Sequence, residues 1–348
     1  MLSNKQLGKI KEHLEKAQNP LFLFDNDVDG LASFMIMRRA FDRGKGVAIK
    51  SSPDLNISYL RKINELNPDY IFILDQPLVS DEFFEEVNKL NLPIVWIDHH
   101  DLGIKAPDYV DYYNSATDEK GDIKPTTYIC YKAVGKKEDE WIAFLGCVSD
   151  GFYPEFSSDV EKKYPDLTTS CKSAFECVYE TKLGKIIRIL SFGLKDRTTN
   201  VINMLRFLVS VKGPYDIFEE NTKTKSFHTR FGQIEEKYRK LVDKAKEDIE
   251  GDLIYFQYGG DLSISAEIAN ELFYLYPKKV IVVAYISGSR ANISMRGSQD
   301  IRKLTEKAIE GLEGATGGGH IHATGAQVLI EDLPKFKARI ETLVSEMF

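Results

Sequence analysis

The fold is best predicted from one stretch near the N-terminus, Leu21-Phe22-Leu23-Phe24-Asp25-Asn26-Asp27-Val28-Asp29-Gly30. Its apolar residues form a short continuous run, which is typical of a buried strand in a parallel sheet. Three aspartates follow, and Gly30 begins a predicted helix that extends to Phe41. Carboxylates this close repel one another unless a multivalent cation or a raised pKa relieves the charge. The stretch therefore predicts a strand, an acidic turn and a helix.

Further apolar runs repeat this arrangement. Strands are predicted at 47–49, 70–74 and 93–97, and helical stretches such as Glu82 to Leu90 separate them. Strands that alternate with helices through short connections indicate an α/β fold with a doubly wound parallel sheet. Asp25, Asp75 and Asp98 each come at the end of such a strand. Because ligands of these sheets bind beyond the carboxyl ends of the strands, we expect the three carboxylates to gather at one edge.

The rest of the chain divides into a helical part and a second α/β part. Between roughly residues 157 and 250 the sequence is mostly helical and charged. Beyond it, strands are predicted at 253–258, 280–286, 290–296 and 326–330, and helices at 266–275, 300–311 and 334–346. We therefore expect an N-terminal α/β domain at 1–156, a helical connector at 157–250 and a smaller C-terminal α/β domain at 251–348.

Composition limits the class of protein. The 348 residues are 43% apolar and 28% charged, which is typical of a globular protein of two domains. No apolar stretch reaches the roughly 18 residues that span a bilayer, and the N-terminus lacks the apolar core of a signal peptide. A net charge of −7 disfavours a long, non-specific duplex binder. We expect a cytoplasmic protein with no membrane partner.

The cysteines support the same location. Cys130, Cys147, Cys171 and Cys177 include no Cys-x-x-Cys pair. This pattern predicts free thiols in a reducing compartment rather than a disulfide framework or a zinc site.

The acidic cluster at 25–29 is open to three interpretations. It matches the start of a calcium-binding EF-hand loop, but that loop needs a Glu where this chain has Ile36, and a helix before it. A solvated acidic turn that caps a helix is the second interpretation. The third is a divalent-metal site, and Asp98-His99-His100-Asp101 and Asp150 support it, because carboxylates also orient ligand imidazoles. We therefore favour a metal site.

These motifs carry a family resemblance. The residues Asp27-Val28-Asp29-Gly30-Leu31-Ala32-Ser33, Asp75, Asp98-His99-His100 and Asp150, in this order, resemble the four motifs of the DHH phosphoesterase superfamily. Two further strings, Ser294-Met295-Arg296 and Gly317-Gly318-Gly319-His320, resemble its C-terminal substrate-binding domain, DHHA1. The resemblance spans nearly the whole chain. It implies a two-manganese hydrolase of the RecJ-like exonuclease or oligoribonuclease type, with Mg²⁺ as an alternative ion.

The resemblance also implies a set of metal ligands. Asp27 and Asp29 would each hold one ion, and Asp75 would bridge the two. His99 and Asp150 would complete the second ion. This mixture of imidazole and carboxylate ligands suits manganese.

Two further roles and one departure follow from the resemblance. His100 would face the phosphate as a catalytic residue, with Asp98 supporting it from behind. Many relatives have a His at the start of the first motif, where this chain offers Leu23 or Asp25. We expect Asp25 to replace that His as a ligand.

The glycine string predicts a substrate-binding loop. Gly317, Gly318 and Gly319 would let backbone N–H groups approach an oxyanion closely. Arg296 would bind a phosphate through two N–H groups, and His320 would donate a hydrogen bond to the same phosphate. A plain glycine turn before the strand at 326–330 is the alternative.

Three functions fit these predictions. The first is an exonuclease or oligonucleotidase that acts on single-stranded RNA or DNA. The second is a phosphatase or phosphodiesterase for small nucleotides, such as phosphoadenosine phosphate or a cyclic dinucleotide. The third is a catalytically weakened structural subunit of a replication complex. As protein partners we consider a second copy of the chain or a replication or repair protein.

Overall fold

The computed structural model describes residues 1–51, 54–117, 122–169, 171–247, 249 and 251–347. It consists of two compact units, Met1–Gly232 and Gln233–Phe348. The division falls inside helix α13 (Lys225–Ala245), the last helix of the predicted connector. Residue 250, at the predicted domain boundary, lies outside the described residues.

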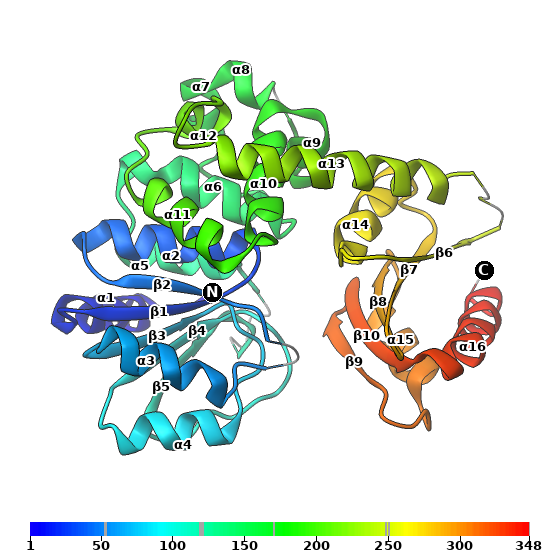
Figure 1. Cartoon of the computed structure of the whole chain (residues 1–348), viewed down its shortest axis with the longest axis horizontal. Helices are drawn as coiled ribbons and strands as arrows, with labels where there is room; N and C mark the ends of the chain where they lie inside the picture. Colours follow the sequence, from blue (N-terminus) through cyan, green and yellow to red (C-terminus); the bar gives the residue numbers. More distant parts are fainter. Residues whose placement is uncertain (52–53, 118–121, 170, 248, 250, 348) are drawn as a thin grey trace. The chain divides into compact units, whose positions relative to one another are not determined.

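The first unit is built on a five-stranded sheet with the order β2-β1-β3-β4-β5 (Figure 1). All neighbouring strands are parallel. The bounds are β1 (Pro20–Asp25), β2 (Lys45–Ile49), β3 (Tyr70–Leu74), β4 (Ile94–Asp98) and β5 (Val110–Asn114). The predicted doubly wound α/β sheet is confirmed, and β5 is a strand that the sequence analysis did not predict.

Helices cover both faces of this sheet, which explains why its central strands are continuous apolar runs. On one face Leu21, Ile71 and Trp96 pack with α3 (Leu60–Leu66) and α4 (Asp81–Lys89). On the other face α2 (Val28–Phe41) lies on β1, and the ring of Phe34 stacks on that of Phe24 with centroids 5.1 Å apart. Helices α1 (Asn4–Lys16) and α5 (Thr126–Val134) pack beside α2. Ser3 caps α1 by accepting a hydrogen bond from the backbone N–H of Gln6.

A group of helices follows the sheet. They are α6 (Glu140–Ser149), α7 (Ser157–Lys163), α8 (Pro165–Thr168), α9 (Ala174–Glu180), α10 (Lys182–Leu194), α11 (Thr198–Val209) and α12 (Pro214–Phe218). Helices α10 and α11 pack on α2, so this group extends the core on that side of the sheet. Among the described residues, no helix combines the length and the apolar character that are needed to cross a membrane.

The cysteine prediction was wrong for one pair. Cys171 and Cys177 form a disulfide, with their Cα atoms 5.2 Å apart, whereas Cys130 and Cys147 are buried free thiols. The turn before α9 brings Cys171 back to the middle of that helix, within the Cα separation that a disulfide needs. A search for Cys-x-x-Cys pairs misses a contact of this kind because the two residues are six positions apart.

The second unit contains a five-stranded mixed sheet with the order β6-β7-β8-β10-β9 (Figure 1). Only β6 and β7 are parallel, and the other neighbours are antiparallel. The elements are β6 (Leu253–Gly259), α14 (Ser265–Leu275), β7 (Val280–Ser287), β8 (Arg290–Arg296), α15 (Ile301–Ile309), β9 (Thr316–His320), β10 (Ala323–Leu329) and α16 (Leu333–Ser345). Ile293 and Met295 of β8 pack with α15 and α16, whereas Ser294 and Arg296 face α14. The predicted smaller C-terminal α/β domain is confirmed.

Candidate metal centre

Carboxylates gather at the carboxyl edge of the first sheet because its strands are parallel. Asp25 and Asp98 are the last residues of β1 and β4, and Asp75 directly follows β3. Asp75 has a φ of 60°, a left-handed conformation that is rare for a residue with a side chain. Its N–H donates to the carbonyl of Ile97, 2.9 Å away. A residue held in this conformation at a strand end is a candidate for function.

Gly30 brings the start of α2 against the end of β1. A Cβ at position 30 would lie 2.5 Å from the carbonyl oxygen of Asp25, so only glycine fits this approach. Asp27 caps the helix by accepting a 2.9 Å hydrogen bond from the N–H of Gly30. Asp29, in the first turn of α2, is buried. The capping role and the metal role of the acidic turn are therefore compatible.

Asp29 is held by residues that the sequence analysis missed. Its two carboxylate oxygens accept hydrogen bonds from the backbone N–H groups of Thr126 and Thr127, at 2.9 and 2.8 Å. These are the first residues of α5, so Asp29 also occupies the anion-binding end of a helix. The hydroxyl of Thr126 donates to Asp75 at 3.0 Å. In the sequence, Pro125-Thr126-Thr127 is typical of the start of a helix and does not indicate a contact with Asp29 or Asp75.

His99 lies among the carboxylates. It is 3% exposed, and its Nε2 lies 3.2 Å from Asp75 Oδ1 and 3.8 Å from Asp29 Oδ2. Its Nδ1 lies 3.7 Å from Asp150 Oδ2. Asp150 follows α6, so the end of this helix contributes a fourth segment to the cluster.

Within the first unit, three groups of side chains offer ligand atoms close enough to share an ion. In each group the ligand atoms lie within 4.8 Å of one another, and the groups are Asp29-Asp75-His99, Asp75-Asp98-His100 and Asp25-Asp27-Asp75. Asp75 belongs to all three groups. Asp25 supplies the third group, whereas Leu23 is buried in the sheet core. The structure therefore brings the predicted ligands together. Of the two residues that could replace the His of many relatives, Leu23 and Asp25, only Asp25 lies among these ligands.

His100 is oriented by Asp98 and by the strand that was not predicted. Its Nδ1 lies 2.7 Å from Asp98 Oδ1. The side-chain amide of Asn114, at the end of β5, donates to the carbonyl of His100 at 2.9 Å and to Asp98 Oδ2 at 3.3 Å. Asn114 thus lies at the carboxyl end of a parallel strand, as Asp25, Asp75 and Asp98 do. It was not predicted as a site residue because strand β5 was not predicted.

The predicted glycine loop is instead a strand. Gly317, Gly318, Gly319 and His320 belong to β9, an edge strand paired with β10. Gly319 has a φ of 136°, and a Cβ there would lie 2.6 Å from the carbonyl oxygen of Ala323. Close approach to the partner strand therefore explains one glycine. The prediction of an open loop was wrong, because this segment pairs with β10, whereas the substrate-binding role of these residues stays a prediction.

Arg296 and His320 lie in one row across this sheet. Ala323 of β10 pairs with Arg296 of β8 on one side and with His320 of β9 on the other. Directly opposed residues point to the same face of a sheet. The Arg296 guanidinium donates to Asn270 of α14 at 2.6 Å and to the carbonyls of Met295 and Thr324 at 2.8 and 3.2 Å. Asn270 is another site residue that the sequence analysis missed.

Residues 250–346 match the DHHA1 domain family. No curated protein matches the sequence. Among solved structures, RecJ from Thermus thermophilus in complex with Mn²⁺ superposes with a TM-score of 0.71 at 14% identity, covering 98% of this chain and 54% of that chain. The chain thus spans about half the length of that RecJ. The C-terminal part of the chain thus matches the DHHA1 family, and the chain as a whole shares the fold of RecJ.

Two further solved structures share the fold. An exonuclease RecJ bound to manganese has a TM-score of 0.61 at 15% identity, with 98% of this chain and 94% of that chain covered. The DHH domain of a protein described as a member of a ribosomal-protein family has a TM-score of 0.69 at 15% identity, with 98% and 89% covered. The predicted fold class is thereby confirmed, and the family match over residues 250–346 supports the DHHA1 part of the resemblance.

In the cluster of the first unit, carboxylates outnumber imidazoles. Burial, then the charge of Asp29, raises the pKa of Asp75 well above its ordinary value. Burial and Asp27 raise the pKa of Asp25 to about 7, and desolvation likewise raises the pKa of Asp150 to about 7. Burial lowers the pKa of His100, but the Asp98 carboxylate outweighs it and raises that pKa to about 9. Two imidazoles do not neutralise the surrounding carboxylates, so the cluster suits divalent cations.

Two buried oxygens next to the candidate ligands support this conclusion. The side-chain oxygens of Asn26 and Gln76 are buried, and neither has a hydrogen-bond partner in the described part of the chain. Asn26 lies between Asp25 and Asp27, and Gln76 follows Asp75. Buried oxygens without donors are costly unless a cation or water satisfies them. The donor set of carboxylates, imidazoles and amide oxygens therefore fits Mn²⁺ or Mg²⁺.

Proposed function

We propose that this DHH/DHHA1 protein is a metal-dependent phosphodiesterase that uses two Mn²⁺ ions to hydrolyse single-stranded oligonucleotides. The observation that carries the proposal is the position of Asp75, which belongs to all three potential ligand groups of the DHH domain. A carboxylate shared in this way is suited to bridge two ions. The RecJ proteins that share the fold are described with Mn²⁺, and the Thermus thermophilus protein also with Mg²⁺.

The proposed ligands divide between the ions as the motifs suggest. Asp27 would hold one ion, with Asp25 in place of the His of many relatives. Asp29, His99 and Asp150 would hold the other, and Asp75 would bind both. The Thr126 hydroxyl would orient Asp75 by its 3.0 Å hydrogen bond. This support from a neighbouring side chain resembles the oriented ligands of other metal sites.

The chemistry divides between the ions and the chain. Bound divalent ions lower the pKa of water and neutralise phosphate charge. The chain positions the phosphate beside them, and we assign this task to His100, whose positive charge is sustained by Asp98. In the DHHA1 domain we propose that Arg296 and His320 bind a second phosphate of the substrate, since both lie in the row through Ala323.

Hydrolysis of a substrate panel tests the proposal. The full chain would be incubated with Mn²⁺ and with single-stranded RNA and DNA oligomers of several lengths, labelled at the 5′ or 3′ end. We expect a ladder of shortened products from oligomers, complete loss of activity in EDTA and recovery on addition of Mn²⁺. The end label that survives would give the polarity of degradation.

The alternatives predict different outcomes of the same assay. Hydrolysis of phosphoadenosine phosphate or a dinucleotide, without any cleavage of longer oligomers, would replace the exonuclease by the small-nucleotide enzyme. If no substrate is hydrolysed and no Mn²⁺ is bound in equilibrium dialysis, the enzymatic proposal would be contradicted. A structural subunit would then be the function that fits.

A further inference from the structure

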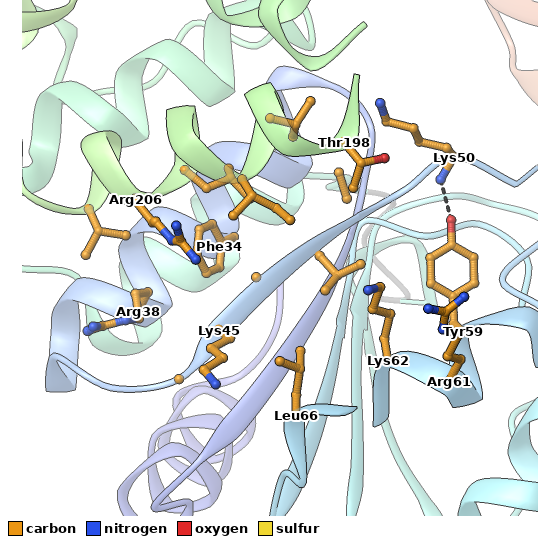
Figure 2. Close-up of a pocket in the computed structure, with 18 of the residues that line it drawn as sticks. Phe34, Arg38, Lys45, Lys50, Tyr59, Arg61, Lys62, Leu66, Thr198 and Arg206 are labelled. Carbon is orange, nitrogen blue, oxygen red and sulfur yellow. Dashed lines mark hydrogen bonds between the residues drawn. The ribbon is translucent and has the colours of Figure 1, made fainter. Parts of the chain in front are cut away.

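A groove of about 780 Å³ follows the open edge of β2 in the first unit. β2 is the last strand on its side of the sheet, and no described strand pairs with its outer side. Figure 2 shows Thr198 and Arg206 of α11 on one side of this strand, and Lys62 and Leu66 of α3 on the other. The groove is therefore bounded by the strand edge and by helices from the two opposite layers. It shares no lining residue with the proposed metal site.

The lining residues show that the groove lies along the edge and not over one face of the sheet. Five consecutive residues, from Gly44 to Ala48, all line it. Successive residues of a strand point to opposite faces. Accordingly, Gly46 approaches the Phe34 ring of α2, whereas Val47 packs with the core under α3 and α4. Residues that point in opposite directions contact one cavity only where that cavity runs beside the backbone.

The backbone at the end of β2 already uses a partner from the groove. The N–H of Lys50 donates to the hydroxyl of Tyr59 at 2.6 Å, the hydrogen bond drawn in Figure 2. N–H groups alternate between the two edges of an extended strand. Those of Gly46 and Ala48 therefore lie on the same side as that of Lys50. An open edge of this kind is a template for an added strand.

The rim of the groove is strongly cationic. None of its lining residues is Asp or Glu, and its basic side chains are Arg38, Lys45, Lys50, Arg61, Lys62 and Arg206. Arg38 pairs with Asp42, and Arg61 and Lys62 share Glu65. Lys45 and Arg206 form no ion pair with any residue that the structure describes. This concentration of positive charge contrasts with the net charge of −7 of the whole chain and favours an acidic occupant.

The floor of the groove favours a peptide over a nucleic acid. Its apolar residues are mainly aliphatic, as in Val47, Val201, Ile202 and Leu205. Ile202 is 37% exposed, so its aliphatic side chain is accessible to a molecule in the groove. Single-stranded nucleic acids are bound mainly by stacking on aromatic rings. Aliphatic side chains and free strand-edge N–H groups are instead what an extended peptide recognises.

We propose that this groove binds an acidic, extended segment of a partner protein, which adds to the sheet as a strand beside β2. The backbone of the segment pairs with Gly46 and Ala48. Its aliphatic side chains contact Val47 and Ile202, and its carboxylates contact Lys45 and Arg206. The five residues of β2 span about 16 Å, so a segment of five to nine residues fills the groove.

Selection from a displayed library of random nine-residue peptides tests this proposal with the full chain. We expect wild-type protein to enrich sequences in which Asp or Glu alternates with aliphatic residues. A double variant, Lys45→Glu with Arg206→Glu, should bind a synthetic recovered peptide at least about tenfold more weakly in fluorescence anisotropy. The matched control is Lys5→Glu with Lys9→Glu, which makes the same change of charge at exposed positions of α1 and should bind like wild type.

The strand geometry is tested separately. A version of the recovered peptide that is N-methylated at alternate residues keeps its charge but loses half of its backbone donors, and it should not bind. Ala48→Pro removes an outward N–H at a strand edge, where proline is tolerated. It should weaken peptide binding while the melting temperature changes little; if Ala48→Pro does not fold, the N-methylated peptide decides the point alone.

Three results would overturn the proposal. One is equal enrichment of acidic peptides on wild type and on the charge-reversal variant, or no enrichment at all. Another is undiminished binding of the N-methylated peptide. The last is binding of a nine-residue oligothymidylate, or self-association of the chain, that is lost in the charge-reversal variant while no peptide binds. The groove would then serve a nucleic acid or a second copy.

Discussion

The two candidate binding regions of this protein hold their charged groups in opposite ways. In the first unit, burial and then the charge of neighbouring carboxylates raise the pKa values of Asp25, Asp75 and Asp150. In the DHHA1 domain, the Arg296 guanidinium donates to Asn270 and to two backbone carbonyls. The carboxylates of the first region thus repel one another, and a cation would relieve this repulsion. The Arg296 guanidinium already has hydrogen-bond acceptors within the protein, so a substrate phosphate would have to replace some of these hydrogen bonds.

The largest effect is expected from Asp75→Asn. The amide keeps the volume of the side chain but removes the charge that all three ligand groups share. We expect hydrolysis to fall at least about a thousandfold and Mn²⁺ to be lost. The metal-free variant should nevertheless melt a few degrees higher than wild type, since a buried repulsion disappears.

Paired measurements check this prediction. Turnover, bound Mn²⁺ by elemental analysis and the melting temperature in EDTA would be compared with those of Asp108→Asn, an exposed aspartate outside the cluster. Wild-type turnover in the Asp75 variant would remove the two-metal proposal. A lower melting temperature in EDTA would instead contradict the claim that the metal-free cluster is repulsive.

Arg296→Ala should show the opposite pattern. Its loss leaves Asn270 and the two carbonyls without their donor, so we expect the protein to lose about 1–3 kcal/mol of stability. If Arg296 also binds phosphate, kcat/KM should fall about 10- to 100-fold while the Mn²⁺ content stays the same.

Arg290→Ala is the matched control for this variant. Arg290 lies at the other end of β8 and donates to Gln327 and to the carbonyl of Gly314. It should lose stability without a change of kcat/KM. Equal kinetic losses in both variants would reduce Arg296 to a structural residue.

The pH dependence of metal binding should distinguish the two regions further. The raised pKa values of Asp25 and Asp150, about 7, mean that the folded metal-free protein holds protons that the unfolded chain releases. Their contribution to stability is therefore present below the ordinary carboxyl pKa and is lost as pH rises toward 7. Mn²⁺ must displace the same protons, so its affinity should rise about tenfold or more from pH 6 to pH 8.

Calorimetric titration with Mn²⁺ at pH 6, 7 and 8 measures this dependence. Asp25→Asn should flatten it, because one of the titrating carboxylates is removed. Arg296→Ala should leave it unchanged, since that residue belongs to the other domain. An Mn²⁺ affinity that is the same at pH 6 and pH 8 in wild type would show that the cluster is already ionised at pH 6.

The comparison also explains what the sequence could predict. Asp25, Asp75 and Asp98 were placed correctly because the ends of parallel strands meet whatever the loops do. Asn114 was missed because strand β5 was not predicted. Thr126 was missed because its role depends on contacts with Asp29 and Asp75, which are distant in the chain. A long-range contact of this kind leaves no local pattern.

The loop conformation of the glycine string was predicted wrongly for a different physical reason. Gly317 to Gly319 are equally compatible with a loop and with an edge strand, because glycine has little preference of its own. Pairing with β10 makes this segment an edge strand, and no residue of the glycine string itself predicts that pairing. Sequence reasoning was therefore reliable where topology determines position and unreliable where only tertiary hydrogen bonds decide conformation.

The smallest effect that we expect is a difference in stability between alanine variants of two adjacent glycines of β9. In Gly319→Ala, the new Cβ would lie 2.6 Å from the carbonyl oxygen of Ala323, at a φ of 136°, so we expect a loss of about 1–3 kcal/mol. In Gly318→Ala, the Cβ meets no atom within 4 Å, and stability should change by less than about 0.5 kcal/mol. Urea unfolding of both variants measures the difference.

If the string were an open loop, the two variants would be equally stable. A KM increase in Gly318→Ala without a loss of stability would show that substrate approaches this strand closely, even though the strand is paired.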